Sequence, residues 1–281
     1  RVLFRSTIGN GGYSSGTAWN STFRHHHGYL IASETPPINR ELTLVNTTER
    51  IVVQSHEFST LSQITLDGNY EGHQHLEHFR FDGVPTYTYA IKDVVFEKTI
   101  APVYMSNCVA IHYEITNGRN PLKFAISPVL NFRSHGDVSS PSSHLFQTIE
   151  SPNQVKVVSG NKQLIIYHSQ GVIDKRFSKQ VNSIYHEFDQ STGDKRLDSY
   201  SLPFEIKLDL KPHEVLRLSV IASTSETHDF DAQSVIDDYK NRHQKLINNV
   251  GITNDFINDL IIAADQFICY RQSTDASTIL A

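Results

Sequence analysis

The sequence predicts a mainly β fold, an antiparallel β-sandwich over residues 1–223 followed by two helices in residues 224–281. Three observations support this prediction. Apolar and polar residues alternate with a period of two between about residues 47 and 223, turn sequences separate the alternating segments, and the period then changes to three and four residues. Many short strands without intervening helical patterns are typical of an antiparallel sandwich.

The alternation is clearest in residues 204–210, FEIKLDL, where four apolar side chains share one face and three charged ones share the other. This pattern predicts a strand with one solvated face. Similar patterns predict strands at residues 86–91, 109–115, 155–158, 164–167 and 215–221. Turns are predicted at residues 67–69, 117–118 and 159–161, where Gly is combined with Asp, Asn or Ser.

The last part of the chain predicts two helices. In residues 229–251 apolar side chains recur at three- and four-residue steps, and Gly251 stands where a helix C-cap would be. A second helix is expected to begin with Thr253 as its N-cap and to carry a wide apolar stripe from Phe256 to Ile268. The sandwich can cover one helix, and we expect the second to pack on a domain that this chain lacks.

Composition argues against several classes of protein. A formal charge of −5 and the lack of a long Lys/Arg run make nucleic acid an unexpected partner. The longest apolar run, residues 260–264, is far shorter than the roughly 18 residues of a membrane span, so we expect a soluble protein. Cys108 and Cys269 are expected to be free thiols in the cytoplasm. The chain begins with Arg1 and has Met105 as its only methionine, which indicates a piece of a longer product.

The stretch from Gly9 to Ser33, GNGGYSSGTAWNSTFRHHHGYLIAS, allows three interpretations. The first is a nucleophile site, because residues 12–16 match the G-x-S-x-G pattern of a nucleophile elbow. That elbow needs a strand, a sharp turn and a helix in an α/β fold. The sequence predicts no such alternation, so we expect a glycine-rich turn instead.

The second interpretation is a metal site, because His25, His26 and His27 are consecutive. In an extended segment only His25 and His27 would point the same way, and further ligands would have to come from elsewhere. His73, His75 and Glu77 would share a strand face and could supply them. Neither spacing is diagnostic, so we expect no metal and no cofactor, and His73 and His75 are expected to form hydrogen bonds on a polar strand face.

The third interpretation is a sugar-facing loop. Sugar rings pair an apolar C–H face with a polar rim, so their sites combine an aromatic platform with fixed donors and acceptors. Tyr13, Trp19, Arg24 and His27 supply both and are the candidate substrate-binding residues. The alternative is structural: Trp19 would be a core residue, and Arg24 and His27 would form hydrogen bonds within the domain.

Several motifs follow one another in order along the chain: Thr7, Gly9, Gly11, Gly12, Tyr13, Ser15, Gly16 and Thr17, then Arg24, His27, Gly28, Leu30, Ile31 and Ala32, then residues 77–82, 96–99 and 264–268. Taken together, these residues resemble the N-terminal domain of bacterial and archaeal glycogen debranching enzymes of the amylo-α-1,6-glucosidase type. The departures from the family's motifs are Ile8, which replaces an asparagine, and His25 and His26, which replace arginine and tyrosine.

The resemblance implies a many-stranded supersandwich joined by linker helices to an (α/α)-barrel that hydrolyses α-1,6 branch linkages of glycogen or a limit dextrin. The segments that carry the catalytic carboxylates in the family would follow Ala281, so we expect no catalytic residue in this chain and no activity from it alone. The expected partners are an α-glucan and the catalytic barrel of the same protein. The alternatives are a stand-alone carbohydrate-binding sandwich and a histidine-based metalloenzyme.

Overall fold

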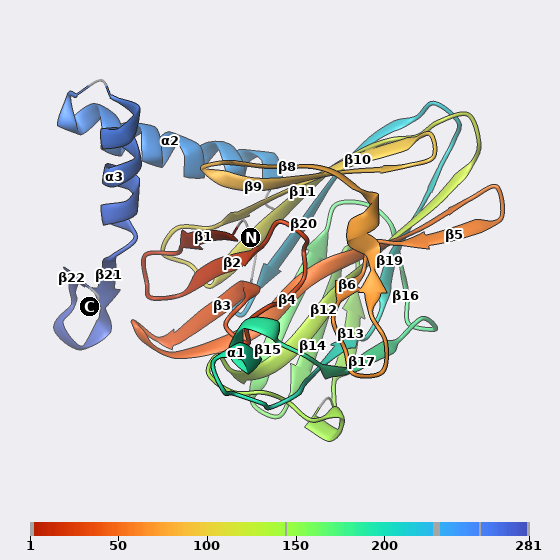
Figure 1. Cartoon of the computed structure of the whole chain (residues 1–281). Helices are drawn as coiled ribbons and strands as arrows, with labels where there is room; N and C mark the ends of the chain where they lie inside the picture. The colour runs from red at the N-terminus through yellow and green to blue at the C-terminus, as the bar shows by residue number, and fades with distance from the viewer. Residues whose placement is uncertain (1–2, 144, 227–230, 253, 280–281) are drawn as a thin grey trace.

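Two large antiparallel sheets face each other in the computed structural model, which describes residues 3–143, 145–226, 231–252 and 254–279 (Figure 1). The predicted fold class, mainly antiparallel β with a sandwich architecture, is confirmed. The predicted strands are found at their expected places, and turns occur at residues 66–67 and 160–161, whereas residues 117–118 lie in the connection between strands of the two sheets. The turn at residues 159–161, for example, joins two neighbouring strands that pair antiparallel.

The first sheet contains ten of the described strands. Its main path runs through β1 (Leu3–Thr7), β2 (Tyr13–Thr17), β3 (Gly28–Thr35), β4 (Ile38–Val53), β12 (Leu122–Ser134), β18 (Asp198–Leu202) and β17 (Lys179–Ile184). Beside this path β5 (His56–Ser59) pairs with β4, β19 (Glu205–Leu210) pairs with β12, and β16 (Val172–Asp174) pairs with β19. The long strands β4 and β12 form the centre of this sheet.

The second sheet contains eight of the described strands. Their order is β13 (Gln147–Ser151), β14 (Gln154–Ser159), β15 (Lys162–His168), β20 (Val215–Ser223), β11 (Cys108–Thr116), β10 (Val94–Pro102), β9 (Val84–Ile91) and β8 (Leu76–Asp82). The short strands β6 (Ser62–Gln63) and β7 (Tyr70–Glu71) pair separately, and 3₁₀ turns occur at η1 (Gly72–His75) and η2 (Pro141–Ser143).

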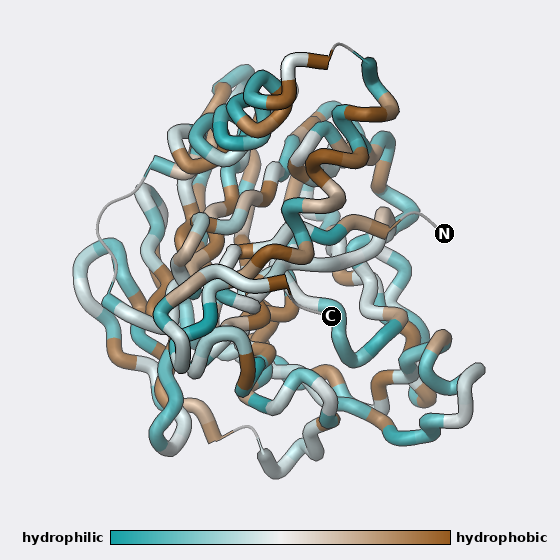
Figure 2. The backbone as a smooth tube through the Cα atoms, turned by 90° about the vertical axis from the view of Figure 1, so that its left-hand side faces the viewer, coloured by the Kyte–Doolittle hydropathy of each residue, from teal (hydrophilic) through white to brown (hydrophobic). Residues whose placement is uncertain are grey.

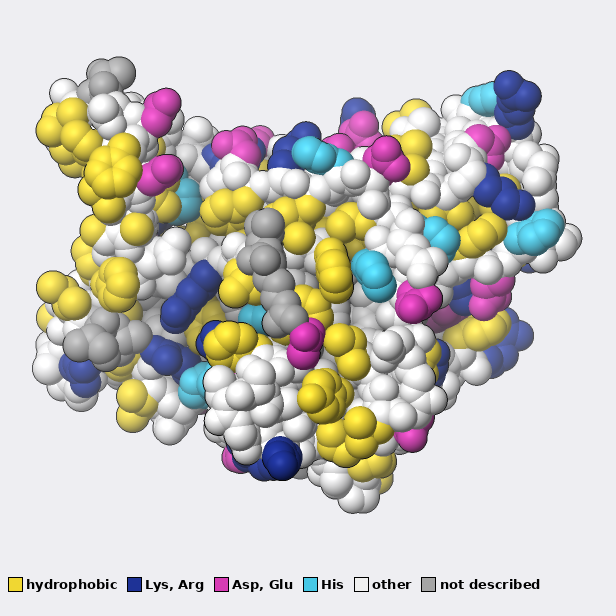
Figure 3. All heavy atoms as spheres, in the orientation of Figure 1, with side chains coloured by type: hydrophobic (Ala, Val, Ile, Leu, Met, Phe, Trp, Pro, Cys, Tyr) yellow, Lys and Arg dark blue, Asp and Glu magenta, His cyan; other side chains and the backbone are white. Residues whose placement is uncertain are grey.

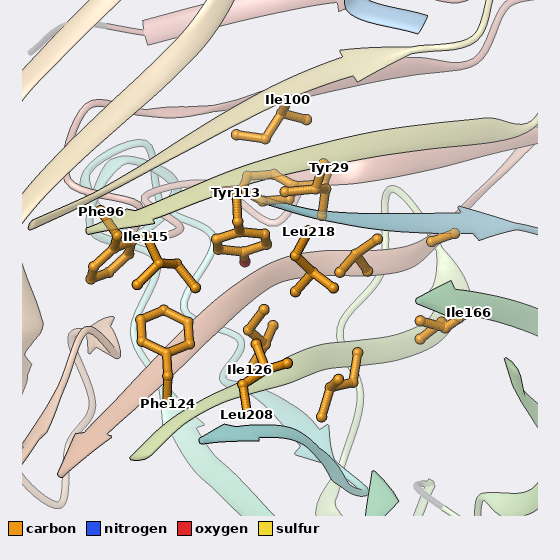
Figure 4. Close-up of a cluster of buried hydrophobic side chains, with 14 of the residues drawn as sticks. Tyr29, Phe96, Ile100, Tyr113, Ile115, Phe124, Ile126, Ile166, Leu208 and Leu218 are labelled. Carbon is orange, nitrogen blue, oxygen red and sulfur yellow. The ribbon is translucent and has the colours of Figure 1, made fainter. Parts of the chain in front are cut away.

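The main core lies between the two sheets, where the alternation buries one face of each (Figure 4). Side chains from the two sheets meet in this core: Phe96, Tyr113 and Ile115 come from the second sheet, and Phe124 and Ile126 from the first. The rings of Phe96 and Phe124 contact edge to face, with their centroids 5.0 Å apart. Period-two alternation therefore produces this core directly.

The prediction for residues 204–210 needs one correction. The apolar face is buried as predicted, but Glu205 on the opposite face is also buried, with only 4% of its surface exposed. Arg50 on β4 forms a bidentate pair with it, at 2.9 and 2.6 Å. The reason is tertiary, because the partner Arg50 comes from a strand distant in sequence and local alternation does not reveal this pairing.

One ion pair lies inside the sandwich. Lys98 on β10 and Glu49 on β4 are fully buried, with Nζ 3.0 Å from Oε1. The hydroxyls of Tyr113 and Thr60 donate to the same carboxylate at 2.7 and 2.5 Å, and Lys98 also donates to the backbone oxygen of Thr47 at 3.0 Å. These hydrogen bonds offset the cost of removing both charges from water, and the pair joins the two facing sheets.

Both predicted C-terminal helices are present, with apolar residues recurring along them (Figure 2). Helix α2 (Ala232–Val250) ends at Gly251, whose φ of +69° is the left-handed C-cap conformation. Its face formed by Ala232, Ile236 and Tyr239 is buried against the second sheet. A short helix within the β region, α1 (Glu187–Ser191), was not expected from the sequence.

The second helix differs from the prediction at both ends. Helix α3 (Asp255–Asp265) has Asn254 as its N-cap, with Oδ1 accepting from the backbone N–H of Ile257, whereas Thr253 lies outside the described residues. The helix also stops before Ile268, which begins a hairpin of β21 (Ile268–Arg271) and β22 (Ala276–Ile279), joined by η3 (Gln272–Thr274). None of the described helices combines the length and the apolar character that a membrane crossing requires.

Candidate functional site

The glycine-rich segment near the start of the chain leads into strand β2. Its backbone lies close to the turn between β3 and β4. Gly11 has a φ of +92°, and a Cβ at this position would lie 2.6 Å from the backbone of Pro37. Only glycine combines this backbone conformation with such a short approach. The glycines therefore pack the first strands against the β3–β4 turn, and the loop of residues 18–27 leaves β2 beside them.

A buried polar network forms hydrogen bonds to the backbone of the loop of residues 18–27. Arg133 on β12 pairs with Asp198 on β18 at 2.7 Å and also donates to the backbone oxygen of His25 at 2.9 Å. His186 contacts Asp198 through Nε2 at 3.3 Å and contacts the backbone oxygen of Thr22 through Nδ1 at 3.2 Å. Burial alone would raise the pKa of Asp198, but the hydrogen bond from His186 and the charge of Arg133 outweigh it and lower the pKa.

A pocket of about 500 Å³ opens where this loop meets the first strands. Figure 3 shows Lys or Arg and His side chains gathered on this side of the molecule, over β1–β3. Three of the four candidate residues, Tyr13, Arg24 and His27, line the pocket. The remaining lining residues are Leu3, Phe4, Arg5, Ser15, His26, Arg40 and His135.

Arg5, Arg40, His26 and His135 were not among the predicted site residues. Arg5 and His26 are near the candidates in sequence, but Arg40 is on β4 and His135 follows β12. Sheet pairing brings these two strands to the pocket, and no local pattern in the sequence marks their ends as part of a site.

Each candidate side chain at the pocket is held in place. The Tyr13 hydroxyl donates to the backbone oxygen of His26 at 3.2 Å. The Arg24 guanidinium stacks on the ring of Phe188, with Cζ 3.6 Å from the ring centroid. His27 is buried, and its Nδ1 accepts a hydrogen bond from the backbone N–H of Phe23 at 3.3 Å. Since Nδ1 is the acceptor, the neutral ring carries its proton on Nε2.

Trp19 lies outside this pocket, on the outer side of the same loop. The residue is 51% exposed, and its ring stacks on His73 and contacts Phe23 edge-on, with ring centroids 4.9 and 5.8 Å apart. The alternative that Trp19 is a core residue is therefore wrong. An exposed indole held between two other rings remains suitable as a platform for an apolar ring face.

The other two interpretations of the opening stretch do not fit the geometry. Ser14 lies within strand β2 and is fully buried, so residues 12–16 do not form an exposed nucleophile elbow. Residues 25–27 do not form an extended segment, because the His27 N–H donates to the Arg24 oxygen at 3.1 Å and closes a turn. His25 pairs with Asp189 through Nδ1 at 2.5 Å.

The expectation for His73 and His75 is wrong as well. They lie in the 3₁₀ turn η1 rather than on a strand with Glu77, and they contact the rings of Trp19 and Phe58. Within the ranges that the structure describes, no three His, Cys, Asp or Glu residues are grouped so that they could hold a metal ion. Both cysteines are free and buried.

Acid should destabilise the fold through His27. Burial, followed by the nearby charges of His186 and Arg24, lowers the pKa of His27 to about 3. The unfolded chain takes up a proton near pH 6.5, so this contribution to stability is complete above that pH and falls as the pH drops toward 3. Between pH 7 and 5 we expect His27 to reduce the free energy of unfolding by about 2 kcal/mol.

The measurement is urea unfolding of the wild type and of His27→Asn, whose amide oxygen can replace Nδ1 as the acceptor. On acidification, the free energy of unfolding should fall less for His27→Asn than for the wild type. The control variant His56→Asn changes an exposed histidine, and its free energy of unfolding should fall as much as that of the wild type. Equal pH dependence of His27→Asn and the wild type would show that His27 does not resist protonation.

Comparison with known proteins gives one matching family model and, among solved structures, two distant matches. A family model described as glycogen debranching enzyme N terminal matches residues 6–217. A solved structure of a bacterial glucoamylase complexed with acarbose is 13% identical, with a TM-score of 0.45, over 94% of this chain and 38% of that chain. A candidate kojibiose phosphorylase from the human microbiome is 7% identical, with a TM-score of 0.36, over 94% of this chain and 37% of that chain. No curated protein matches.

Proposed function

The chain belongs to the glycogen debranching enzyme N-terminal family, and from this we propose that it is the noncatalytic domain that shapes the substrate cleft of a glycoside hydrolase. The proposed substrate of the full-length enzyme is an α-1,6 branch linkage of glycogen or a related α-glucan. The family match supports an N-terminal domain of a glycoside hydrolase-like enzyme. We further propose that the cleaved bond is the α-1,6 linkage, that the substrate is an α-glucan, and that this domain shapes the substrate cleft.

The observation that carries the proposal is the meeting of two family-like motifs at one accessible surface. Tyr13 comes from the glycine-rich motif of β2, and Arg24 and His27 come from the motif that leads into β3, and all three line the same pocket. Trp19 lies on the loop between these motifs and is half exposed. An aromatic platform beside fixed hydrogen-bond donors is what a sugar ring requires.

The pocket itself supplies no pair of carboxyl groups. Glycoside hydrolysis needs one carboxyl to protonate the leaving oxygen and a second one to activate water or to attack the sugar. Of the described residues that line this pocket, none is Asp or Glu. This composition supports a domain that contacts the glucan while a partner domain cleaves it.

The C-terminal helices support a partner domain. Arg242 on α2 forms a bidentate pair with Asp265 on α3, both bonds at 2.7 Å, and its guanidinium lies 3.8 Å from the Tyr104 ring centroid. These contacts fix α3 while Phe256 and Leu260 remain 70% and 51% exposed. Figure 3 shows hydrophobic side chains gathered on this end of the molecule. We propose that this surface packs against the catalytic barrel, with residues 1–223 as the sandwich and 224–281 as the helical linker.

This chain alone should release no glucose from a branched limit dextrin, because the proposal places the catalytic carboxylates in another domain. The measurement is chromatographic detection of glucose, with heated protein as the control. Addition of the family's catalytic barrel as a separate chain should restore some release. Heat-sensitive release by this chain without the barrel would contradict a noncatalytic role.

A further inference from the structure

The arginines at the pocket differ from most others in the molecule. Within the described ranges, seven arginines form ion pairs with carboxylates: Arg50, Arg80, Arg133, Arg176, Arg196, Arg217 and Arg242. No described carboxylate pairs with Arg5, Arg24, Arg40, Arg119 or Arg271, and the first three of these line one pocket. Unpaired guanidinium groups are therefore concentrated at this site.

The three guanidinium groups are positioned by contacts that leave terminal nitrogens free. Arg40 donates from Nε to the backbone oxygen of Gly11 at 2.7 Å. The Cζ atoms of Arg5 and Arg40 lie 4.7 and 6.0 Å from the centroid of the Tyr13 ring. Arg24 rests on Phe188. Within the described part of the chain, none of their terminal nitrogens has a hydrogen-bond acceptor, so each can still bind a ligand oxygen.

The rest of the described pocket lining adds histidine rings and no negatively charged group. The rings of His26 and His135 are 5.2 Å apart at the pocket, and its described lining includes no carboxylate. A neutral glucan gives three guanidinium groups no charge to bind. A phosphate group matches them well, because its oxygens fit the planar fork of arginine and charge-assisted hydrogen bonds are stronger than neutral ones.

We propose that this pocket binds the phosphate monoester of a sugar, with the phosphate between the arginines and the sugar in the rest of the pocket. The ligand could be a free sugar phosphate or a phosphorylated residue of a glucan, and both carry the same group. This inference goes beyond the proposed function, and it can be tested on this chain whether or not the chain binds neutral glucan.

The test is isothermal titration calorimetry at low ionic strength with glucose 6-phosphate, inorganic phosphate and glucose. Glucose 6-phosphate should bind saturably and more tightly than either of the other probes. Arg5→Gln and Arg40→Gln should each weaken this binding about tenfold or more, since each removes a charge-assisted contact. Arg119→Gln is the matched control, because it removes an exposed arginine that has no described carboxylate partner and does not line the pocket, and this variant should bind like the wild type.

Several results would overturn the proposal. They are equal binding of glucose and glucose 6-phosphate, binding of inorganic phosphate as tight as that of the sugar phosphate, and binding that does not depend on Arg5 and Arg40. Absence of binding by every probe would also overturn it. Thermal unfolding of each variant checks its fold, and if Arg40→Gln proves unstable, Arg5→Gln decides the outcome because the Arg5 side chain is exposed. A separate glucan titration reports on the proposed function, so either idea can fail alone.

Discussion

Lys98→Met should lower the free energy of unfolding by about 3–5 kcal/mol, because it leaves Glu49 buried between the sheets without its counter-charge. Lys98 and Glu49 are fully buried with Nζ and Oε1 3.0 Å apart, so water cannot replace the ammonium group. Tyr113 and Thr60 would still donate to the carboxylate, but neutral donors do not compensate a buried charge. The measurement is the urea midpoint at pH 7.

Two further variants make this result specific. The double variant Lys98→Met with Glu49→Leu removes both charges and should recover much of the lost stability, although it leaves two hydroxyls without their acceptor. Lys240→Met breaks a surface pair with Asp82 and should change the midpoint little. If Lys98→Met and Lys240→Met have equal effects, the buried pair does not join the sheets in the way described.

The second large effect is expected from Asp198→Ala. This side chain accepts hydrogen bonds from Arg133, Asn131 and the backbone of Ser139, and it contacts His186. Its removal leaves the Arg133 guanidinium buried and unpaired, so we expect a loss of about 3–5 kcal/mol in unfolding free energy. Because Arg133 also holds the backbone oxygen of the pocket loop, the variant should bind pocket ligands more weakly even where it is folded.

Denaturant unfolding and ligand titration of the same preparation measure both effects. Asp194→Ala, which breaks an exposed pair with Arg196, is the control and should affect neither. A stable Asp198→Ala variant with unchanged ligand binding would show that this network does not support the loop.

The strands could be predicted because burial of one sheet face imposes a period of two on the sequence. Helix α2 could be predicted for the same kind of reason, with Gly251 marking its end. The hairpin after α3 could not be predicted, because Phe267 and Ile268 continue the apolar spacing of the helix although the chain has already left it. After the helix, the backbone N–H groups of Tyr270 and Gln272 donate to the backbone oxygens of Gly9 and Pro36 at 2.8 and 3.0 Å, and local periodicity carries no information about such tertiary contacts.

The site could be predicted only in part. Tyr13, Arg24 and His27 are close in sequence and were found together, but Arg40 and His135 reach the pocket through the pairing order of β3, β4 and β12. Lys98 and Glu49 are a similar case: no individual strand was predicted at either residue, and only the packing of the two sheets shows that they form a pair. Polar residues that meet across sheets leave no local pattern.

A fluorescence titration tests the central claim, contact between this domain and an α-glucan, most directly. Trp19 is the only tryptophan in the chain and is 51% exposed, so its emission reports on this loop alone. A branched limit-dextrin oligosaccharide should shift the emission to shorter wavelength in a saturable way, because a stacked sugar excludes water from the indole. Arg24→Lys, which keeps the charge but loses the planar fork, should weaken this response, and a cellulose-derived oligosaccharide should give none. If the branched glucan leaves the emission spectrum unchanged throughout the titration, the claim is contradicted.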